Sequence, residues 1–172
     1  GFGVLRVMND DLVQPQRGFG THPHRDMEII TFVVEGALTH KDSMGTEETL
    51  ERGSIQFMTA GTGVRHSEHN LDPKRPLRFI QSWVVPRARG LSPNYGSMVG
   101  DEAAAAKRRN QWAHVVADVR AGAGATPVQI NQDCNVYVAE LDAGASAPAL
   151  EIKPGRQGYM LLVEGEAGVA GQ

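Results

Sequence analysis

The sequence has few of the features that would place it outside a reducing compartment or inside a membrane. It contains a single cysteine, Cys134, so no internal disulfide can form. One unpaired cysteine is typical of proteins from a reducing compartment. No apolar run approaches the roughly 20 residues that a membrane-spanning helix needs. We therefore expect a cytoplasmic protein that does not contact a membrane.

An excess of basic residues is also missing. The formal net charge is −3 at pH 7 and the isoelectric point is about 6.1, so charge gives no reason to expect nucleic acid as a direct partner. The basic cluster 107–109 is short and fits the end of a helix. Residues 1–7 lack the basic start of a signal peptide and are typical of a strand. The chain begins without Met and stops just after a turn signal, so we expect it to be a piece of a longer chain.

Glycine and proline, in contrast, are plentiful. The 20 glycines and nine prolines separate short apolar runs, a pattern that predicts an all-β protein. One helix is expected over residues 101–110, which have an alanine run, an acidic start and a basic end. The predicted strands are 3–8, 27–35, 37–42, 54–59, 64–70, 77–85, 114–119, 128–131, 135–141, 149–152, 158–164 and 166–170.

The strands fall into two units. Residues 86–95 are rich in proline, glycine and arginine, as a linker between domains often is. We expect a first unit over 1–92, a connector with the short helix over 93–112, and a second unit over 113–172.

A short internal repeat supports this division. Residues 30–36 (ITFVVEG) resemble residues 159–165 (YMLLVEG), and each run ends in a Glu-Gly turn. The same offset places Glu151, Lys153 and Gln157 where the first unit has His22, His24 and Glu28. The second unit is therefore expected to lack the first pair of metal-binding residues.

Two short motifs in the first unit predict a metal site. His22-Pro23-His24 and His66-Ser67-Glu68 each offer two ligand groups at positions i and i+2. On a strand these positions face the same way, so each pair can converge on one ion. Three imidazoles and a carboxylate suit a redox-active divalent metal with open positions, whereas closed structural sites usually contain thiolates. Pro23 has no N–H, so this segment must be an edge strand or the start of a strand.

Other polar residues near these motifs receive simpler interpretations. Glu28 shares the strand parity of His24, and we expect it to orient an imidazole rather than bind the ion. Asn70 shares the parity of His66 and is expected to hydrogen-bond beside the ligands, whereas His69 points away. The residues interpreted as ordinary structural side chains are His40, His114 and Cys134.

The two motifs also carry a family resemblance. Residues 18–36, with THPHRDME at their centre, resemble the first cupin motif in its pirin variant, and residues 53–70 resemble the second. Residues 81–86 and 89–95 are similar to the same family. The chain thus resembles the pirin family of the cupin superfamily, and in particular bacterial pirin-like proteins with quercetin dioxygenase activity.

The resemblance implies an all-β bicupin fold, with two antiparallel β-barrels packed face to face. The C-terminal barrel is then incomplete in this chain and has no ligands. One metal ion is implied in the N-terminal barrel, bound by His22, His24, His66 and Glu68. Fe(II) is the ion that we expect, with Cu, Mn, Ni, Co or Zn as alternatives, since imidazole and carboxylate accept several first-row ions.

The activity that the resemblance implies is the 2,3-dioxygenation of flavonols such as quercetin with O2. Glu68 would accept the proton of the flavonol hydroxyl, and Phe32, Phe57 and Met58 are candidates to line an aromatic pocket. Two alternatives remain open: a non-catalytic metal-dependent regulator that binds a partner protein, and a cupin isomerase that does not use O2. The expected partners are a small aromatic substrate and O2, and the expected assembly is a monomer or a weak homo-oligomer.

Overall fold

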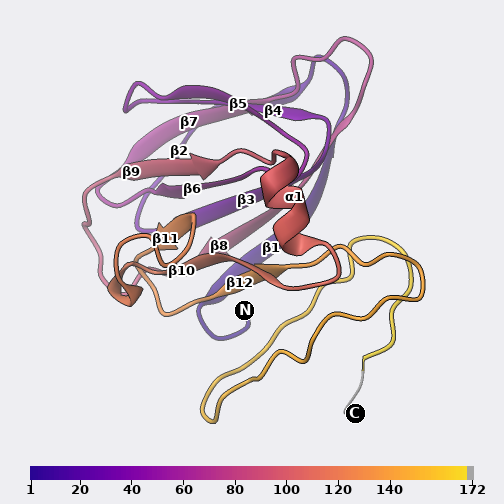
Figure 1. The fold of residues 1–172 in the computed structure, drawn as a ribbon. Coiled ribbons are helices and arrows are strands. Elements are labelled where there is room, and N and C mark those ends of the chain that lie inside the picture. Colours follow the sequence, from indigo (N-terminus) through magenta and orange to yellow (C-terminus); the bar gives the residue numbers. More distant parts are fainter. Residues whose placement is uncertain (170–172) are drawn as a thin grey trace.

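The computed structural model describes residues 1–169, in which two antiparallel sheets face each other and form the first unit (Figure 1). The larger sheet has the strand order β1-β8-β3-β6-β9, and the smaller has the order β2-β7-β4-β5. The larger sheet consists of β1 (Leu5–Val13), β8 (Leu77–Val84), β3 (Glu28–Glu35), β6 (Ile55–Thr59) and β9 (Asn94–Met98). The smaller sheet consists of β2 (Gly18–His24), β7 (Val64–His69), β4 (Ala37–Asp42) and β5 (Glu47–Glu51).

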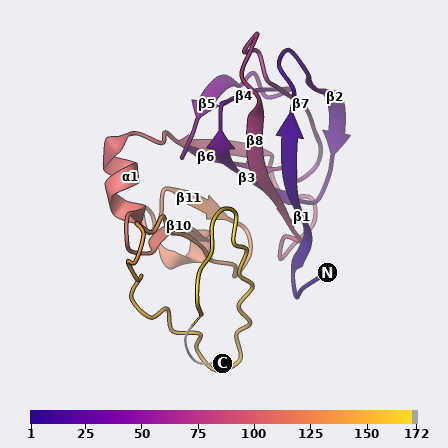
Figure 2. The same cartoon turned by 90° about the vertical axis from the view of Figure 1, so that its right-hand side faces the viewer.

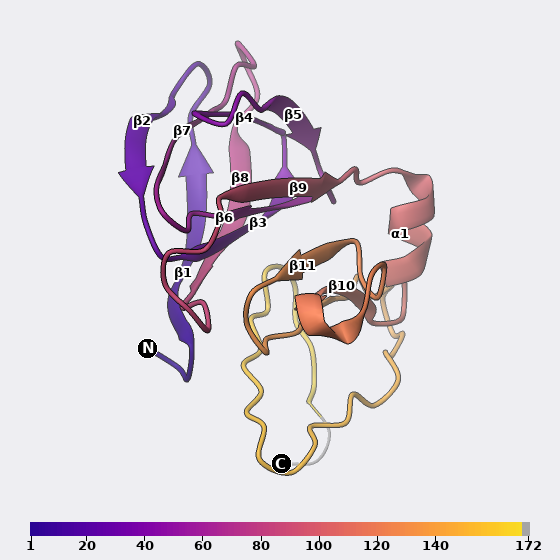
Figure 3. The same cartoon turned by 90° about the vertical axis from the view of Figure 1, so that its left-hand side faces the viewer.

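A second, smaller unit packs on the larger sheet (Figure 3). Its central strand β10 (Ala113–Asp118) pairs in parallel with β11 (Val128–Ile130) and antiparallel with β12 (Val136–Val138). A 3-10 turn, η1 (Val119–Ala121), follows β10. The structure confirms the expected class, a mostly antiparallel all-β fold with a short second cupin unit.

The helix α1 (Glu102–Arg108) lies within the range predicted for it. The Asp101 side chain accepts a hydrogen bond from the backbone N–H of Ala104 at 2.8 Å, which satisfies an otherwise free amide at the helix start. Within residues 1–169 no helix is long and apolar enough to cross a membrane.

A continuous apolar cluster joins the two units. Val116 and Ile130 of the second unit are fully buried against Ile30, Phe57 and Val84 of the larger sheet. Side chains alternate between the two faces of a strand, so the opposite face of the same sheet is left for the barrel interior. The larger sheet therefore has two buried faces with different neighbours.

Glu28 belongs to the outer of these faces, and the prediction that it orients an imidazole is wrong. Its carboxylate accepts a hydrogen bond from Thr59 Oγ1 at 2.9 Å and longer ones from the backbone and side chain of Asn131. The parity argument failed because Asp26, between β2 and β3, has a positive φ of 50°. That turn resets the alternation, so His24 and Glu28 face different ways.

Two strands, β5 and β9, escaped the sequence prediction, and β2 was expected only as the edge segment around Pro23, without bounds. Each is an edge strand, and their sequences are polar or contain glycine. β1 also runs further than expected, because Asn9, Asp10 and Asp11 pair with β8 although asparagine and aspartate are depleted in strands. Pairing with a neighbour outweighed local propensity in all four places.

The strands predicted over 149–152, 158–164 and 166–170 do not form in the described part of the chain, and residue 170 lies outside it. Figure 2 shows this segment, in yellow, as an extended loop below the second unit. Apolar side chains along it are exposed, among them Ile152 and Leu162. A strand needs a hydrogen-bonding neighbour, and β10, β11 and β12 do not extend to this segment.

Two isoleucine substitutions test this arrangement. Ile130 is fully buried between the units, and Ile152 is 53% exposed. We expect Ile130→Ala to lower the free energy of unfolding by about 2–5 kcal/mol and Ile152→Ala to change it by less than about 0.5 kcal/mol. Chemical denaturation measures both. An equal loss in the two variants would show that residues 149–152 are packed after all.

Candidate metal centre

Three histidines converge at one end of the smaller sheet. His22 and His24 lie on β2, His66 lies on β7, and the register pairs His22 directly with His66. The ring centroids are 4.5 Å apart for His22 and His66, 4.8 Å for His22 and His24, and 4.9 Å for His24 and His66. One ligand atom from each residue lies within 4.8 Å of the others. The structure therefore brings together three of the four residues predicted as ligands, and this group can hold a metal ion.

The position of β2 explains how its histidines reach this place. β2 is an edge strand of the smaller sheet, as the proline between its histidines requires. Between Phe19 and His22 the register with β7 shifts by one residue, a β-bulge. Bulges commonly re-aim side chains near functional sites, and here the shift sets His22 opposite His66.

The ring nitrogens of these histidines fit a metal. His22 Nδ1 lies 2.8 Å from the carbonyl oxygen of Gly20, so it carries the proton and leaves Nε2 as a free lone pair. His66 is only 2% exposed, and neither of its ring nitrogens has a hydrogen-bond partner among the described residues. A buried polar atom without a partner costs about 1–3 kcal/mol. A bound ion would satisfy a nitrogen of His66.

The electrostatic environment keeps two of the imidazoles neutral. Burial, followed by the neighbouring His22, lowers the pKa of His24 to about 4. Burial and the nearby His22, His24 and His40 lower the pKa of His66 to about 3. Neutral imidazole is the form that binds metals. At neutral pH these rings need lose no proton to bind an ion.

Glu68 is the fourth residue predicted as a ligand. It lies two residues after His66 on β7 and is 3% exposed. Its Oε2 accepts a hydrogen bond from Gln81 Nε2 at 2.9 Å, and its Oε1 accepts from Gln81 at 3.1 Å and from Gln56 at 3.2 Å. Trp83 Nε1 donates to Gln81 Oε1 at 2.9 Å and so fixes the orientation of that amide. Burial raises the pKa of Glu68, and the bond from Gln81 opposes this.

Sequence reasoning missed the roles of Gln56 and Gln81. A signal was present for Gln56, a polar residue between apolar neighbours in IQFMT of β6, but it was weaker for Gln81, because LRFIQSWV of β8 also contains Arg78 and Ser82. Their partner, however, is on another strand and cannot be identified from local sequence.

Glu68 is not part of the three-histidine group but of a second one, with His66 and His40. His40, interpreted from the sequence as an ordinary side chain, thus belongs to a group that could hold a metal ion. His40 is fully buried, and its ring lies 5.4 Å from that of His66. β4 pairs with β7 so that His40 is opposite Glu68, and this long-range register is not visible in the sequence.

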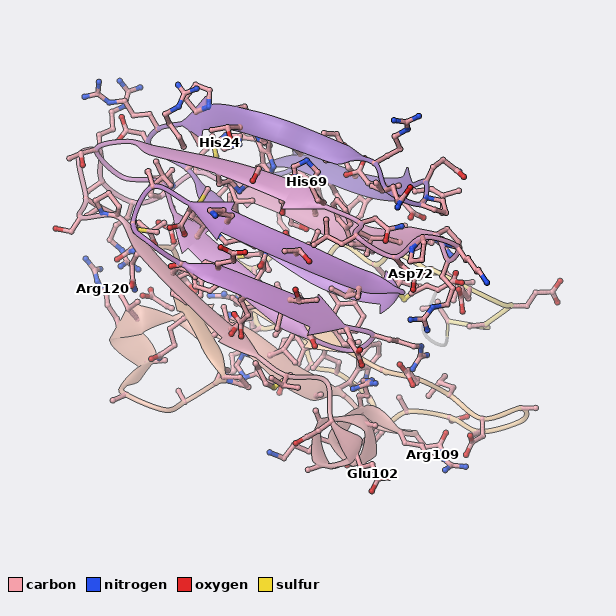
Figure 4. The ribbon with its side chains drawn as sticks, turned by 90° about the horizontal axis from the view of Figure 1, so that it is seen from above. His24, His69, Asp72, Glu102, Arg109 and Arg120 are labelled. Carbon is pink, nitrogen blue, oxygen red and sulfur yellow. The ribbon has the colours of Figure 1, made fainter. Side chains whose placement is uncertain are left out.

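His69 is the last residue of β7, and Asn70 follows it. Neither belongs to the two groups that could hold a metal ion. In Figure 4 His69 lies apart from His24 and toward Asp72. The side chain of Asn70 bonds instead to backbone groups of Val13, Arg75 and Asp72, at 2.8–3.1 Å. The expected role of Asn70 beside the ligands is wrong, because its polar atoms hold the following loop.

Two of the three residues proposed to line an aromatic pocket are also misplaced. Phe57 and Phe32 pack in the cluster between the two units. Met58 alone is on the barrel side, beside Trp83. The ring of Trp83 meets His24 edge-on at 4.8 Å and so provides an aromatic surface at the histidine group.

The two remaining residues interpreted as ordinary belong to neither group. His114 Nε2 lies 2.9 Å from Asn135 Oδ1, and its ring stacks on Tyr137. Cys134 is partly buried against the cluster between the units, and burial raises the pKa of its thiol.

A surface hollow of about 400 Å³ adjoins the histidine group. His24 contributes to its wall together with two arginines, Arg25 and Arg65. The other lining residues are Pro23, Ser43, Gly63 and Val64. The histidine group is thus accessible from solvent on the side of His24.

Comparisons with known proteins agree with this geometry. A family model described as Pirin matches residues 2–84, and a model described as Quercetinase C-terminal cupin domain matches residues 120–172. A pirin-like protein of Caulobacter vibrioides is 37% identical over 173 residues, which are 99% of this chain and 70% of that protein. The chain belongs to the pirin family.

Other pirin relatives match over shorter stretches. A quercetin 2,3-dioxygenase of Escherichia coli K12 is 50% identical over 95 residues, which are 55% of this pirin and 41% of the relative. The crystal structure of the bacterial pirin YhhW from Escherichia coli in complex with nickel(II) has a TM-score of 0.70 at 37% identity. That match covers 80% of this pirin and 55% of YhhW, so the chain spans about half the length of these relatives.

Two histidine variants of this pirin test the grouping. His66 lies in both groups and His69 in neither, although both are on β7. We expect wild type to bind one ion per chain, His66→Ala to lose most of it, and His69→Ala to keep it. Elemental analysis of the purified proteins measures the content. Equal loss in both variants would contradict the grouping, and two tightly bound ions per chain would contradict a mononuclear centre.

Proposed function

We propose that this pirin is a metal-dependent dioxygenase that cleaves flavonols such as quercetin at the 2,3-bond with O2. The observation that carries the proposal is the convergence of three imidazoles beside a buried carboxylate and a solvent-accessible hollow. The similarity to a quercetin 2,3-dioxygenase of Escherichia coli K12 supports the choice of reaction and substrate.

In this proposal His22, His24, His66 and Glu68 hold the ion. Four protein ligands leave about two positions open on an octahedral ion. Such an open site suits Fe(II), whereas structural metal sites are usually closed. When bound, such an ion supplies Lewis acidity and redox chemistry toward O2. Nickel is present in the related YhhW structure, and it remains an alternative here.

Glu68 accepts the proton of the flavonol hydroxyl. Burial raises its pKa, which makes the carboxylate a better proton acceptor than an exposed one. Gln56 and Gln81 make three hydrogen bonds to its oxygens, and a carboxylate has about four lone-pair sites. The two amides therefore hold Glu68 in place and leave about one site, which the ion occupies in this proposal, so the proton takes the place of one amide hydrogen bond.

The hollow beside His24 is suited to a substrate that carries negative charge. Arg25 and Arg65 line it with positive charge, whereas Trp83 packs against His24 but is not among the lining residues. An ionised flavonol hydroxyl is attracted to such a rim.

The carboxylate is tested by Glu68→Gln, which keeps an oxygen but cannot act as a base. We expect turnover of quercetin, normalised to bound metal, to fall by roughly 10²–10⁴, the usual contribution of a general base. Oxygen consumption measures it.

The matched control is Glu47→Gln. Glu47 is an exposed carboxylate of the same barrel that pairs with Lys41 and belongs to neither metal-binding group, so its normalised rate should stay near wild type. A normalised rate for Glu68→Gln equal to wild type would show that Glu68 is a ligand only. If wild type consumes no O2 with quercetin or a related flavonol, the proposed activity is wrong and a regulatory role is favoured.

The arginine rim is tested by Arg65→Gln. We expect the KM for quercetin to rise by up to about 5-fold with kcat unchanged, because exposed charge pairs are weak. Steady-state oxygen consumption measures both constants. Arg120→Gln, at an exposed arginine far from His24 (Figure 4), should leave KM unchanged. A KM that does not respond to Arg65→Gln would exclude an electrostatic role for this rim.

A further inference from the structure

A fully buried hydrogen bond between His40 and Asp42 lies in the barrel beside the histidine group and is not used by the proposed mechanism. His40 Nε2 lies 2.9 Å from Asp42 Oδ2, and both side chains are 0% exposed. The other oxygen of Asp42 accepts hydrogen bonds from the backbone N–H groups of Met44 and Thr46, at 2.8 and 3.1 Å. The two backbone donors favour the ionised form of Asp42. An ionised carboxylate can only accept, so His40 Nε2 carries the hydrogen and donates the hydrogen bond to Asp42.

The second ring nitrogen of His40, Nδ1, therefore has a lone pair that accepts no hydrogen bond from the described residues. His40 Nδ1 is buried and has no hydrogen-bond partner among the described residues. One face of the ring stacks on Tyr95 at 4.6 Å, and the ring of His66 lies 5.4 Å away. Both nitrogens of His66 also lack a partner. A buried acceptor next to a second partnerless imidazole is unfavourable unless something binds between them.

The anchoring of His40 is that of a metal ligand. A metal-binding histidine usually donates its other ring N–H to a carboxylate or a backbone carbonyl, which fixes the ring and its tautomer. His22 shows this arrangement with the carbonyl of Gly20, and His40 shows it with Asp42. Ligand atoms of His40, His66 and Glu68 all lie within 4.8 Å of one another.

We propose that His40 is a metal-binding residue, and that with His66 and Glu68 it forms an inner ion position deeper in the barrel than the three-histidine group. This rests on the proposed metal centre, since His66 and Glu68 belong to both positions. Two imidazoles and a carboxylate suit a first-row divalent ion. His40 is fully buried and is not among the residues that line the hollow beside His24.

The test isolates the inner position by removing the outer one. The double variant His22→Ala/His24→Ala keeps all three inner residues. Metal-free wild type and double variant are titrated with Co(II) alone and followed by calorimetry and visible absorption. We expect wild type to bind one Co(II) and the double variant still to bind one Co(II), more weakly.

His40→Gln is then added to the double variant. A glutamine amide can still donate a hydrogen bond to Asp42 from the place of Nε2, so the fold is preserved better than with alanine. The substitution removes the Nδ1 lone pair. We expect the affinity for Co(II) to fall by about 10-fold or more. His69→Gln in the same background is the matched control and should leave the affinity unchanged. Electron paramagnetic resonance of the Cu(II)-loaded proteins should show one imidazole nitrogen fewer after His40→Gln only.

The outcomes separate this inference from the function proposed above. If wild type binds no Co(II), the metal centre itself is wrong and both proposals fall. If wild type binds Co(II) but the double variant does not, only the inner position is wrong. If the double variant binds Co(II) with equal affinity and equal nitrogen count with and without His40→Gln, then His40 is no ligand and only donates a hydrogen bond to Asp42.

Discussion

The register of β7 between its two neighbours places every group of the metal centre. On one side β2 sets His22 opposite His66, and on the other side β4 sets His40 opposite Glu68. A slip of one residue in either pairing would turn the inward side chains to the outer face of the sheet. The bulge between Phe19 and His22 is part of this register, because without its extra residue the two histidines of β2 would not meet His66. The centre is therefore a property of strand pairing more than of any single motif.

The polar interior that results is stable only because most of its atoms are paired. Glu68 is satisfied by two amides, one of which is itself held by Trp83, and His40 is satisfied on one side by Asp42. In a medium of low polarity such networks become rigid when complete and are unfavourable when incomplete. Within residues 1–169, the buried side-chain atoms of the barrel that lack a hydrogen-bond partner are both ring nitrogens of His66 and Nδ1 of His40. These are the atoms that the proposals assign to metal binding.

The sequence was sufficient where the rule involved was local. The i, i+2 rule found His22, His24 and His66, and punctuation by glycine and proline indicated the all-β class. Prediction from the sequence failed where the position of a side chain depends on pairing with a strand distant in sequence or on the geometry of a turn. The positive φ of Asp26 separated Glu28 from the histidine face, and the role of His40 depends on the register between β4 and β7. The strands expected after residue 148 failed for the same reason, since alternation alone cannot supply a neighbouring strand.

The second unit can stabilise the centre although it contributes no residue to either group. Strand β6 alternates between the two sides of the larger sheet: Gln56 and Met58 face the barrel, whereas Ile55 and Phe57 face the second unit. Packing on the outer face fixes the strand, and the strand in turn fixes the amide that bonds to Glu68. Tight packing transmits small displacements because interiors contain few voids. A change in the interface between the units would therefore be felt first in the orientation of Gln56, and through its hydrogen bond in the position of the Glu68 carboxylate.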